Sequence, residues 1–401
     1  MRVLAINCGS STLKFKLVEA AGATRTIARG LVERIGDENP SLTFSSENDV
    51  SEQPAAAPDH ETAILVVLDR LASAGLAAPE AFGHRVVHGG DHFSGPALID
   101  SGVISAIEDL SELAPLHNGP SLEAILASSE AADPYVPMVA VFDTAFHSAM
   151  PERASLYPIP KEMAEKHGIR RFGFHGTAHR CMVERYAALT ATPVRDTRLV
   201  TLQLGNGCSA TAVSGGRSVD TSMGFTPLEG LMMGTRSGNV DPSLVGFLAR
   251  REDVDAEEVE GWLNKRSGLL GISGISRDVR ELLDAEARGD DRAALALEMF
   301  CDRVRKHVGA YLNVLCGADA VVFGGGIGEN APLIRERVLS GMDWCGLVLD
   351  PERNAGAVGV EARISTEGSK IHAYVVHVDE ETRIAEDTVH LLRFRGRDRL
   401  H

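Results

Sequence analysis

Two stretches of the chain, far apart in sequence, share one pattern of apolar and polar positions. Residues 3–18, VLAINCGSSTLKFKLV, read as an apolar strand, a glycine-serine turn and a second strand in which Leu13, Phe15 and Leu17 alternate with lysines. Alternation of this kind is typical of a half-buried strand. Residues 199–213, LVTLQLGNGCSATAV, repeat the same plan. We therefore predict two similar units, with chance resemblance of two glycine-turn hairpins as the alternative.

Apolar residues recur at helical spacing elsewhere and predict helices over residues 60–78 and 292–316. Residues 318–332, ADAVVFGGGIGENAP, instead predict a buried strand that breaks into a glycine loop, with a helix after it. Such a loop presents backbone N–H groups and a helix N-terminus to phosphate. Strands and helices in this mixed order predict an α/β fold. The apolar positions are Ile64, Leu65, Leu68, Leu71 and Ala72 in the first helix and Leu295, Met299, Val304, Val308 and Leu312 in the second.

Length and composition exclude several classes of protein. A chain of 401 residues exceeds one comfortable hydrophobic core, which favours two domains. The net charge of −16 disfavours binding to nucleic acid or to an anionic membrane. Six scattered cysteines without a CxxC pair indicate reduced thiols. No apolar run approaches the roughly 20 residues of a membrane helix, so we expect a soluble, cytoplasmic protein.

Three glycine-rich turns, at 7–14, 205–209 and 324–330, each follow an apolar strand. Tight turns use glycine for conformational reasons alone. Three turns that also carry Asn or Ser are better explained by a polyphosphate lying along them. Neither GxxxxGK[ST] nor GxGxxG occurs in these turns, which excludes P-loop and Rossmann sites. Lys14 either reaches a phosphate or faces solvent.

Two segments contain repeated histidines. In GHRVVHGGDHF, residues 83–93, the glycines argue against a helical metal site, and Arg85 is the residue placed to project into a cavity. In FGFHGTAH, residues 172–179, Gly176 stands where a zincin requires Glu, which excludes a metalloprotease. His175 is then either a hydrogen-bond donor held by aromatic packing or a satisfied core histidine.

The segment DTSMGFTPLEGLMMGTRSG, residues 220–238, leads through an apolar, glycine-rich run to a single arginine, Arg236. A surface arginine needs no such setting, whereas one that meets an anion in a dry site does. Carboxylates also follow two apolar strands, at Asp143 and at residues 379–381. They either orient an arginine, bind Mg²⁺ directly or through water, or simply favour a helix N-terminus.

These segments resemble, in order and spacing, the motifs of acetate kinases. The resemblance rests on INCGSSTLKFKL, GFHGTAH, LGNGCS, DTSMGFTPLEGLMMGTRSGNVDPS and FGGGIGENAP. It implies the superfamily of acetate and sugar kinases, heat-shock chaperones and actin, with two ribonuclease-H-like domains flanking a nucleotide cleft. We expect residues 1–146, completed by 380–401, to form the first domain. Residues 147–379 would form the second, with the nucleotide site and a homodimer interface.

The implied reaction is reversible, Mg²⁺-dependent transfer of a phosphoryl group from ATP to acetate by direct in-line attack, with Mn²⁺ as an alternative metal. Asn7 and Glu380 would hold the metal, while His175 and Arg236 would hold the phosphoryl group. We hypothesise that Asp143 orients Arg236 or metal-bound water, because ionised acetate needs no general base. The other implied contacts are Arg85 with the acetate carboxylate; Val87, Leu116, Phe174 and Pro227 around the methyl group; and Lys14, Gln203, Leu204, Gly205, Asn206, Gly207, Asp278, Val279, Arg280, Gly326, Ile327, Gly328, Glu329 and Asn330 with the nucleotide.

The chain departs from the family pattern at two nucleotide positions. Gln203 stands where most members have histidine, and Val279 where an aromatic residue often borders the adenine. One alternative is therefore an acetate kinase with another donor, such as pyrophosphate. A propionate or butyrate kinase is a second alternative, which depends on the size of the methyl pocket. From other classes, a nucleotide-dependent, chaperone-type binding module would hydrolyse ATP without acetate. A histidine-based metal hydrolase would contain stoichiometric zinc.

Overall fold

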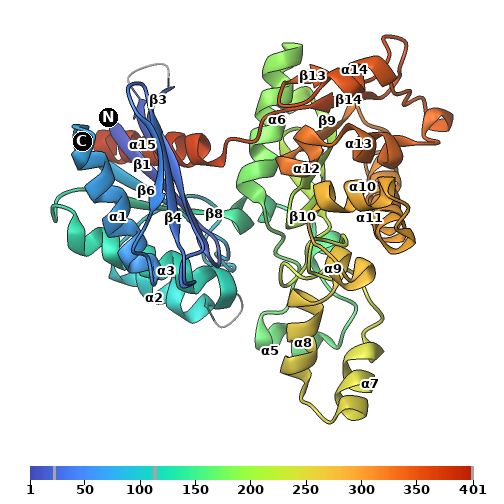
Figure 1. Ribbon diagram of the computed structural model, residues 1–401, viewed down its shortest axis with the longest axis horizontal. Helices are drawn as coiled ribbons and strands as arrows, with labels where there is room; N and C mark the ends of the chain where they lie inside the picture. The colour runs from blue at the N-terminus through green and yellow to red at the C-terminus, as the bar shows by residue number, and fades with distance from the viewer. Residues whose placement is uncertain (21–23, 112–114, 399–401) are drawn as a thin grey trace. The chain divides into compact units, whose positions relative to one another are not determined.

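The computed structural model describes residues 1–20, 24–111 and 115–398, except for the side chains of 115–117 and 395–398. The chain divides into two compact units (Figure 1): unit 1 comprises Met1–Ser148 and Asp379–His401, and unit 2 comprises Ala149–Val378. All six cysteines are free thiols. In the described part of the chain, no helix combines the length and the hydropathy of a membrane span.

Unit 1 is built on an eight-stranded sheet with the strand order β5-β4-β3-β2-β1-β6-β8-β7. Strand β1 pairs antiparallel with β2 and parallel with β6, which pairs parallel with β8. The strands are β1 (Arg2–Cys8), β2 (Thr12–Ala20), β3 (Thr24–Glu33), β4 (Ser41–Ser46), β5 (Val50–Pro54), β6 (Ala81–Val86), β7 (Ala97–Leu98) and β8 (Met138–Phe142).

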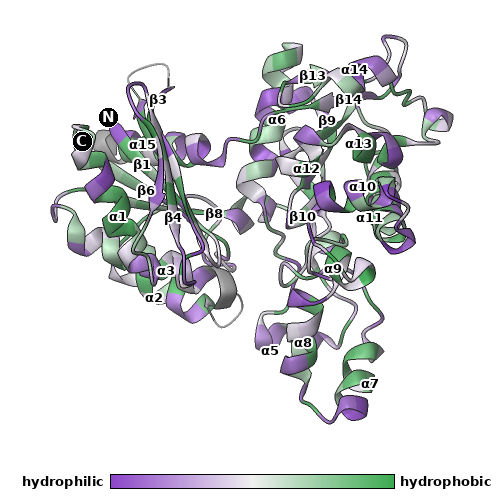
Figure 2. Ribbon diagram, in the orientation of Figure 1, coloured by the Kyte–Doolittle hydropathy of each residue, from purple (hydrophilic) through white to green (hydrophobic). Residues whose placement is uncertain are grey.

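Alternate residues of β1 face two different layers of helices. Leu4 and Ile6 belong to a core shared with α1 and α3, while Val3 and Ala5 pack with Ile384 of α15. Helix α15, red in Figure 1, therefore covers a sheet made from the opposite end of the chain. Figure 2 shows the apolar residues of this unit along the inner strands and on α1. The helices are α1 (His60–Ser73), α2 (Ser101–Leu110), α3 (Pro115–Ala131), the 3-10 helix η1 (Asp143–His147) and α15 (Glu380–Asp398).

Unit 2 has a six-stranded sheet with the order β11-β10-β9-β12-β14-β13, packed against α6 and α11. Its strands are β9 (Arg198–Leu204), β10 (Cys208–Ser214), β11 (Arg217–Thr221), β12 (Ala320–Gly324), β13 (Ala362–Arg363) and β14 (His372–Val375). Its helices are α4 (Glu152–Ser155), α5 (Lys161–His167), α6 (Gly176–Thr190), η2 (Val194–Asp196), α7 (Ser243–Glu252), α8 (Ala256–Lys265), α9 (Gly268–Ser273), α10 (Val279–Ala287), α11 (Asp291–Val314), α12 (Gly325–Asn330), α13 (Pro332–Leu339), η3 (Asp343–Cys345) and α14 (Pro351–Gly356).

The two sheets share one topology. In each, an antiparallel hairpin and a third strand are followed by two strands parallel to the first, giving β3-β2-β1-β6-β8 in unit 1 and β11-β10-β9-β12-β14 in unit 2. This is the ribonuclease-H-like arrangement of the actin-like ATPase fold. The predicted α/β fold with two related hairpins is confirmed.

The predicted helices differ from the observed ones in detail. Helix α1 ends at Ser73 because Gly75, with φ of 70°, turns the chain. Leu65, expected on the buried face, is 47% exposed, and Leu295 at the start of α11 is 40% exposed. The glycine-rich segment after β12 is not an open loop but the short helix α12. Helix α13 follows it as predicted.

A buried histidine in unit 1 should make stability depend on pH. His84 is 1% exposed, and neither ring nitrogen has a hydrogen-bond partner. Burial lowers the pKa of His84 to about 3. The ring is therefore neutral in the folded chain but takes up a proton in the unfolded chain below a pKa of about 6.5.

Because only the unfolded chain takes up this proton, the free energy of unfolding is unaffected by His84 well above pH 6.5. It then decreases as pH falls toward 3, by ~1.4 kcal/mol per pH unit. We expect His84→Leu to remove about 2 kcal/mol of the stability difference between pH 6.5 and pH 5. Urea unfolding at both pH values would measure it. An unchanged difference in the variant would contradict the prediction.

Candidate active-site residues

In unit 1, the buried side chain of Asp143 meets Arg85. Strand β6 lies beside β8, and the register pairs Arg85 with Val141, two residues before Asp143. Arg85 Nη2 donates to Asp143 Oδ2 at 2.5 Å, and Nε lies 3.2 Å from both carboxylate oxygens. Burial alone would lower the pKa of Arg85, but Asp143 and Glu380 more than offset this and raise it. The guanidinium is therefore a fixed cation.

Asn7 links this pair to the first turn of α15. Its side-chain oxygen accepts from Arg85 Nη1 at 2.9 Å, and its Nδ2 donates to Glu380 at 2.9 Å and to Glu381 at 3.0 Å. Burial, together with Asp143 and Glu381, raises the pKa of Glu380 even though Arg85 opposes the change. The structure thus brings together four residues that the sequence places in the site: Asn7, Arg85, Asp143 and Glu380.

Asn7 and Glu380 could bind a divalent cation that takes most of its other ligands from water and substrate phosphates. Within the described residues, no group of three or more His, Cys, Asp or Glu side chains is arranged to hold a metal ion. Glu380 and the amide oxygen of Asn7 nevertheless offer hard oxygen ligands of the kind that Mg²⁺ accepts. Mg²⁺ usually keeps several waters and binds through one or two carboxylates plus substrate phosphates.

The two lysines of β2 differ in their surroundings. Lys14, opposite Asn7 in the register, is exposed and lies close enough to Glu380 to lower its pKa. Lys16 is 9% exposed and bonds both oxygens of Asp379, at 2.5 and 2.6 Å. The simple alternation of the sequence predicted solvent for Lys16. Its partner lies more than 360 positions away, so no local signal could have shown the pairing.

In unit 2, His175 stands immediately before α6 with φ of 56°, a left-handed conformation that non-glycine residues rarely adopt. Its Nδ1 lies 2.9 Å from Ser209 Oγ, which in turn lies 2.7 Å from His179 Nε2. His179 Nδ1 continues the chain to Thr201 Oγ1 at 2.8 Å. These partners fix the ring, and its Nε2 side lies near Gly207.

Arg236 reaches the same glycine. A Cβ atom on Gly207 would lie 3.4 Å from His175 Nε2 and 3.6 Å from Arg236 Nη1. Arg236 Nη1 also donates to the carbonyl oxygen of Pro227 at 3.3 Å. The apolar residues before Arg236 are buried as the sequence predicts: Leu231 and Met233 are 0% exposed. The imidazole and the guanidinium therefore converge on one turn of the backbone.

That turn lies against α12. Gly325 has φ of 77°, and a Cβ there would come within 2.9 Å of the Gln203 side chain. Glycine is required because the end of β9 and the start of α12 approach so closely. The predicted nucleotide residues 203–207 and 326–330, which belong to two of the three glycine-rich segments, are thus neighbours in unit 2. In 203–207 Leu204 is buried and Asn206 exposed, while in α12 Gly326 is exposed and Ile327 half-buried.

Other predicted nucleotide contacts have internal partners. Asp278 caps α10 and pairs with Arg280, whose side chain is 89% exposed. Val279 is only 4% exposed, so its side chain offers little surface to a base. Glu329 accepts from Gly325 N at 3.1 Å and pairs with His377 at 2.5 Å. Asn330 donates to the carbonyl oxygen of Gly326 at 3.0 Å.

The residues predicted to surround the methyl group come from both units. Val87, in unit 1, is 3% exposed, and Phe174, in unit 2, is 1% exposed. Pro227 is half-buried. The side chain of Leu116 lies outside the described residues.

Helix α12 is held by a residue that no sequence pattern singles out, Arg335. Arg335 is completely buried and makes five hydrogen bonds, two of them to the carbonyl oxygens of Gly328 and Glu329. The others go to Asn354 and Ala357. Burial without a carboxylate among these partners lowers the pKa of Arg335 to about 10. In the sequence it is an ordinary helical arginine.

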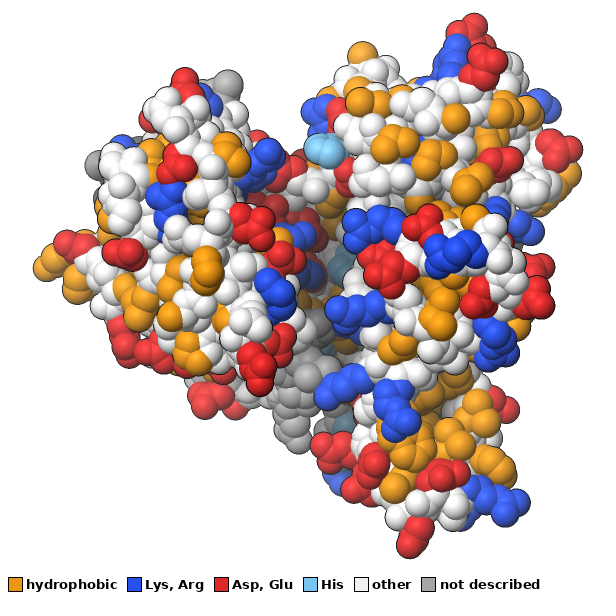
Figure 3. Space-filling view, in the orientation of Figure 1, with side chains coloured by type: hydrophobic (Ala, Val, Ile, Leu, Met, Phe, Trp, Pro, Cys, Tyr) orange, Lys and Arg blue, Asp and Glu red, His pale blue; other side chains and the backbone are white. Residues whose placement is uncertain are grey.

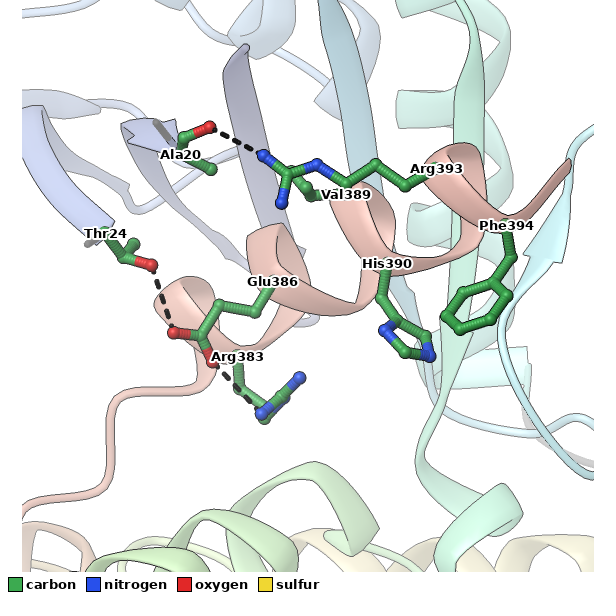
Figure 4. Close-up of a pocket in the computed structure, with 8 residues that line it drawn as sticks. All are labelled: Ala20, Thr24, Arg383, Glu386, Val389, His390, Arg393 and Phe394. Carbon is green, nitrogen blue, oxygen red and sulfur yellow. Dashed lines mark hydrogen bonds and ion pairs between the residues drawn. The ribbon is translucent and has the colours of Figure 1, made fainter. Parts of the chain in front are cut away.

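A separate pocket of about 460 Å³ lies along α15 in unit 1 (Figure 4). Arg383 pairs with Glu386 and Asp387, and Arg393 donates to the carbonyl oxygen of Ala20. None of the predicted site residues is among its lining residues: Ala20, Thr24, Arg383, Glu386, Val389, His390, Arg393 and Phe394.

The two ribonuclease-H-like units and a glycine-rich turn approached by an arginine and an imidazole define the class, a phosphotransferase with the actin-like ATPase fold. Comparison with known proteins then gives the family. The chain belongs to the acetokinase family, which matches it over residues 2–386.

The relatives match over nearly their full lengths. The acetate kinase of Thermoanaerobacterium thermosaccharolyticum is 48% identical over 97% of this chain and 98% of its own. The acetate kinase of Bacillus subtilis is 46% identical over 98% and 100%. Among solved structures, Porphyromonas gingivalis acetate kinase has a TM-score of 0.89 at 41% identity, covering 98% and 99%. A propionate kinase from Francisella tularensis has a TM-score of 0.91 at 39% identity, covering 97% and 99%.

Proposed function

We propose that this chain is an acetate kinase, which transfers the terminal phosphoryl group of ATP to acetate and gives acetyl phosphate and ADP. The observation that carries the proposal is the convergence of His175 and Arg236 on Gly207 in a member of the acetokinase family. Relatives that are 46–48% identical over almost the whole chain and are named acetate kinases support it.

Unit 2 would stabilise the phosphoryl group during transfer. Negative charge then lies on three equatorial oxygens, and catalysis is chiefly positioning and charge stabilisation. Arg236 supplies a planar fork of donors that keeps its proton. His175 would supply a second polar contact from its Nε2 side, which lies near Gly207. The buried residues Leu231 and Met233 would exclude water, which strengthens both contacts.

Unit 1 would hold the acceptor. Arg85 has five N–H donors; its contacts to Asp143 and Asn7 engage all three nitrogen atoms but leave N–H groups on Nη1 and Nη2 for a carboxylate. Asp143 would therefore act by orienting Arg85, which differs from the orienting role toward Arg236 that the sequence suggested. Asn7 and Glu380 would hold Mg²⁺, which would neutralise phosphate charge when bound.

Trapping of the acyl phosphate with hydroxylamine tests the function. Acetate, propionate and butyrate would each be combined with ATP, GTP and pyrophosphate, with and without Mg²⁺. We expect acetate with MgATP to give the highest kcat/KM and EDTA to abolish the signal. Hydrolysis of ATP that does not depend on any carboxylate would contradict the proposal.

We also propose that the protein is a homodimer. Helix α7 buries none of its residues, although it carries Leu244 and Phe247, which are 41% and 47% exposed. Figure 3 shows hydrophobic side chains gathered over α7 and α8. An apolar face of this kind is typical of a protein interface, and a second copy of the chain is the partner that the family resemblance implies.

Sedimentation velocity would test the dimer. We expect a mass of twice 42.8 kDa for the unchanged chain and a monomer for Phe247→Asp. Tyr135→Asp is the control, because Tyr135 is 94% exposed in unit 1. A monomeric unchanged chain, or a Phe247→Asp variant that remains dimeric, would rule out this interface.

A further inference from the structure

Three polar side chains of unit 2 form a cluster apart from the residues discussed so far: Tyr157, Arg171 and Glu229, here called the Arg171 cluster. Arg171 Nη2 donates to Glu229 Oε1 at 2.6 Å, and the Tyr157 hydroxyl donates to Glu229 Oε2. Arg171 also lies over the Tyr157 ring, 5.4 Å from its centre. The side chains of Arg171 and Glu229 are 18% and 31% exposed, so water screens the charges only in part.

The cluster binds the backbone of the segment that leads to Arg236. Arg171 Nη1 donates to the carbonyl oxygens of Ser222 and Met223, at 3.3 and 3.0 Å. Phe225 N donates to the Tyr157 hydroxyl oxygen at 2.8 Å. Glu229 itself belongs to this segment and lies two residues after Pro227, whose carbonyl oxygen accepts from Arg236. One cluster thus fixes both ends of residues 222–229.

The same cluster explains a glycine in this segment. A Cβ on Gly224 would overlap both Glu229 Oε2 and the Tyr157 hydroxyl, far inside the 3.0 Å that real Cβ contacts respect. The carbonyl oxygen of Gly224 also accepts from Phe172 N at 3.0 Å and from Gly173 N at 3.2 Å. The backbone of 222–225 is therefore held directly against 171–173.

Residues 171–173 lead without interruption to His175. The cluster consequently connects the two segments whose side chains converge on Gly207, one ending in His175 and the other carrying Pro227 and Arg236. We infer that the Arg171 cluster is a positioning group for phosphoryl transfer that sets the spacing between His175 and Arg236. This inference rests on the proposed function for its kinetic consequences but not for its geometry.

If the cluster were purely structural, its loss would affect only stability. The test therefore compares Glu229→Gln with Glu286→Gln, which breaks a similar ion pair elsewhere in the unit. Glu286 and Arg337 form a bidentate ion pair of similar burial in the same unit, with side chains 24% and 34% exposed. Because a misplacement of about 1 Å costs up to ~10²-fold in rate, we expect Glu229→Gln to lower kcat by tenfold or more. KM for ATP should stay within about twofold of the unchanged value. Glu286→Gln should leave both constants within about twofold.

A Glu229→Gln protein with kcat within about twofold of normal, and with the same loss of melting temperature as Glu286→Gln, would overturn the inference. If Glu229→Gln does not fold, Tyr157→Phe can replace it, because this variant removes a single hydroxyl. It should also lower kcat, by a smaller factor, and leave KM for ATP nearly unchanged. Equal effects of Tyr157→Phe on kcat and on KM for ATP would overturn it as well.

Crystal structures of the unchanged chain and of Glu229→Gln give a readout that is independent of activity. We expect the Arg236 guanidinium to move by about 1 Å or more relative to the His175 ring. Superposable positions of the two side chains would overturn the inference. An unchanged chain that makes no acetyl phosphate would refute the proposed function, and the crystal structures would still decide whether the cluster positions these residues.

Discussion

Replacing Arg236 with alanine is expected to lower the turnover of acetyl phosphate formation by about 10³-fold or more, as loss of an arginine finger does in other phosphoryl-transfer enzymes. The physical reason is that the guanidinium converges with His175 on Gly207 and lies beside the fully buried Leu231 and Met233. Charge stabilisation is worth most in such a dry setting. Steady-state kinetics with acetate and MgATP would measure the loss.

The control is Arg195→Ala, because Arg195 belongs to the same unit and its side chain is 84% exposed. This variant should have normal turnover. A second variant, Arg236→Lys, should recover little activity, since a lysine cannot offer the planar fork. A folded Arg236→Ala protein that loses less than about tenfold would show that Arg236 does not contact the phosphoryl group.

Asp143→Asn is expected to have the second largest effect. The change leaves the buried guanidinium of Arg85 without the carboxylate that balances it, and breaking a buried pair in this way costs about 3 kcal/mol or more of unfolding free energy. Arg85 would also lose its orientation, so we expect KM for acetate to rise and kcat to fall. Denaturant unfolding and acetate titrations at saturating MgATP would measure the two effects.

Two further variants separate these effects. Arg85→Met combined with Asp143→Asn should regain part of the stability, because the buried guanidinium that lost its carboxylate is also removed, but none of the activity. Asp49→Asn, which breaks the ion pair with Arg70 in the same unit, should cost about 1 kcal/mol or less, because Asp49 is 39% exposed. Near-normal turnover of Asp143→Asn would contradict an active-site role for Asp143.

Much of the fold could be predicted from local patterns. The alternation in 12–20 and the repeat around Asn206 identified both hairpins, because side chains of a half-buried strand must alternate between core and solvent. The details depended on tertiary packing. Leu65 has the right spacing for the buried face of α1 but lies on the outer side. Lys16 looked like a solvent-facing lysine, yet α15 brings Asp379 to it.

In the candidate site, too, some residues could be identified from local sequence and others only from the folded structure. Arg236, His175, Asn7 and Arg85 were identifiable because each interrupts a glycine-rich or apolar run, where a polar group needs a reason. The residues that hold them in place were not. Glu229 and Arg335 occupy ordinary-looking positions, and their partners come from segments that only the folded chain brings together. Spacing within a motif carries no information about contacts between distant segments.

Helix α15 has a consequence for how the protein is made. It packs on Val3 and Ala5 of the first strand and supplies Glu380 to Asn7, although Glu380 follows Asn7 by 373 positions in the chain. During synthesis, residues 1–148 therefore stay incomplete, with one apolar side of their sheet uncovered, until α15 has been made. The uncovered sheet is open to chaperones while residues 149–379 are synthesised, and a product terminated before α15 lacks both the cover and the carboxylate.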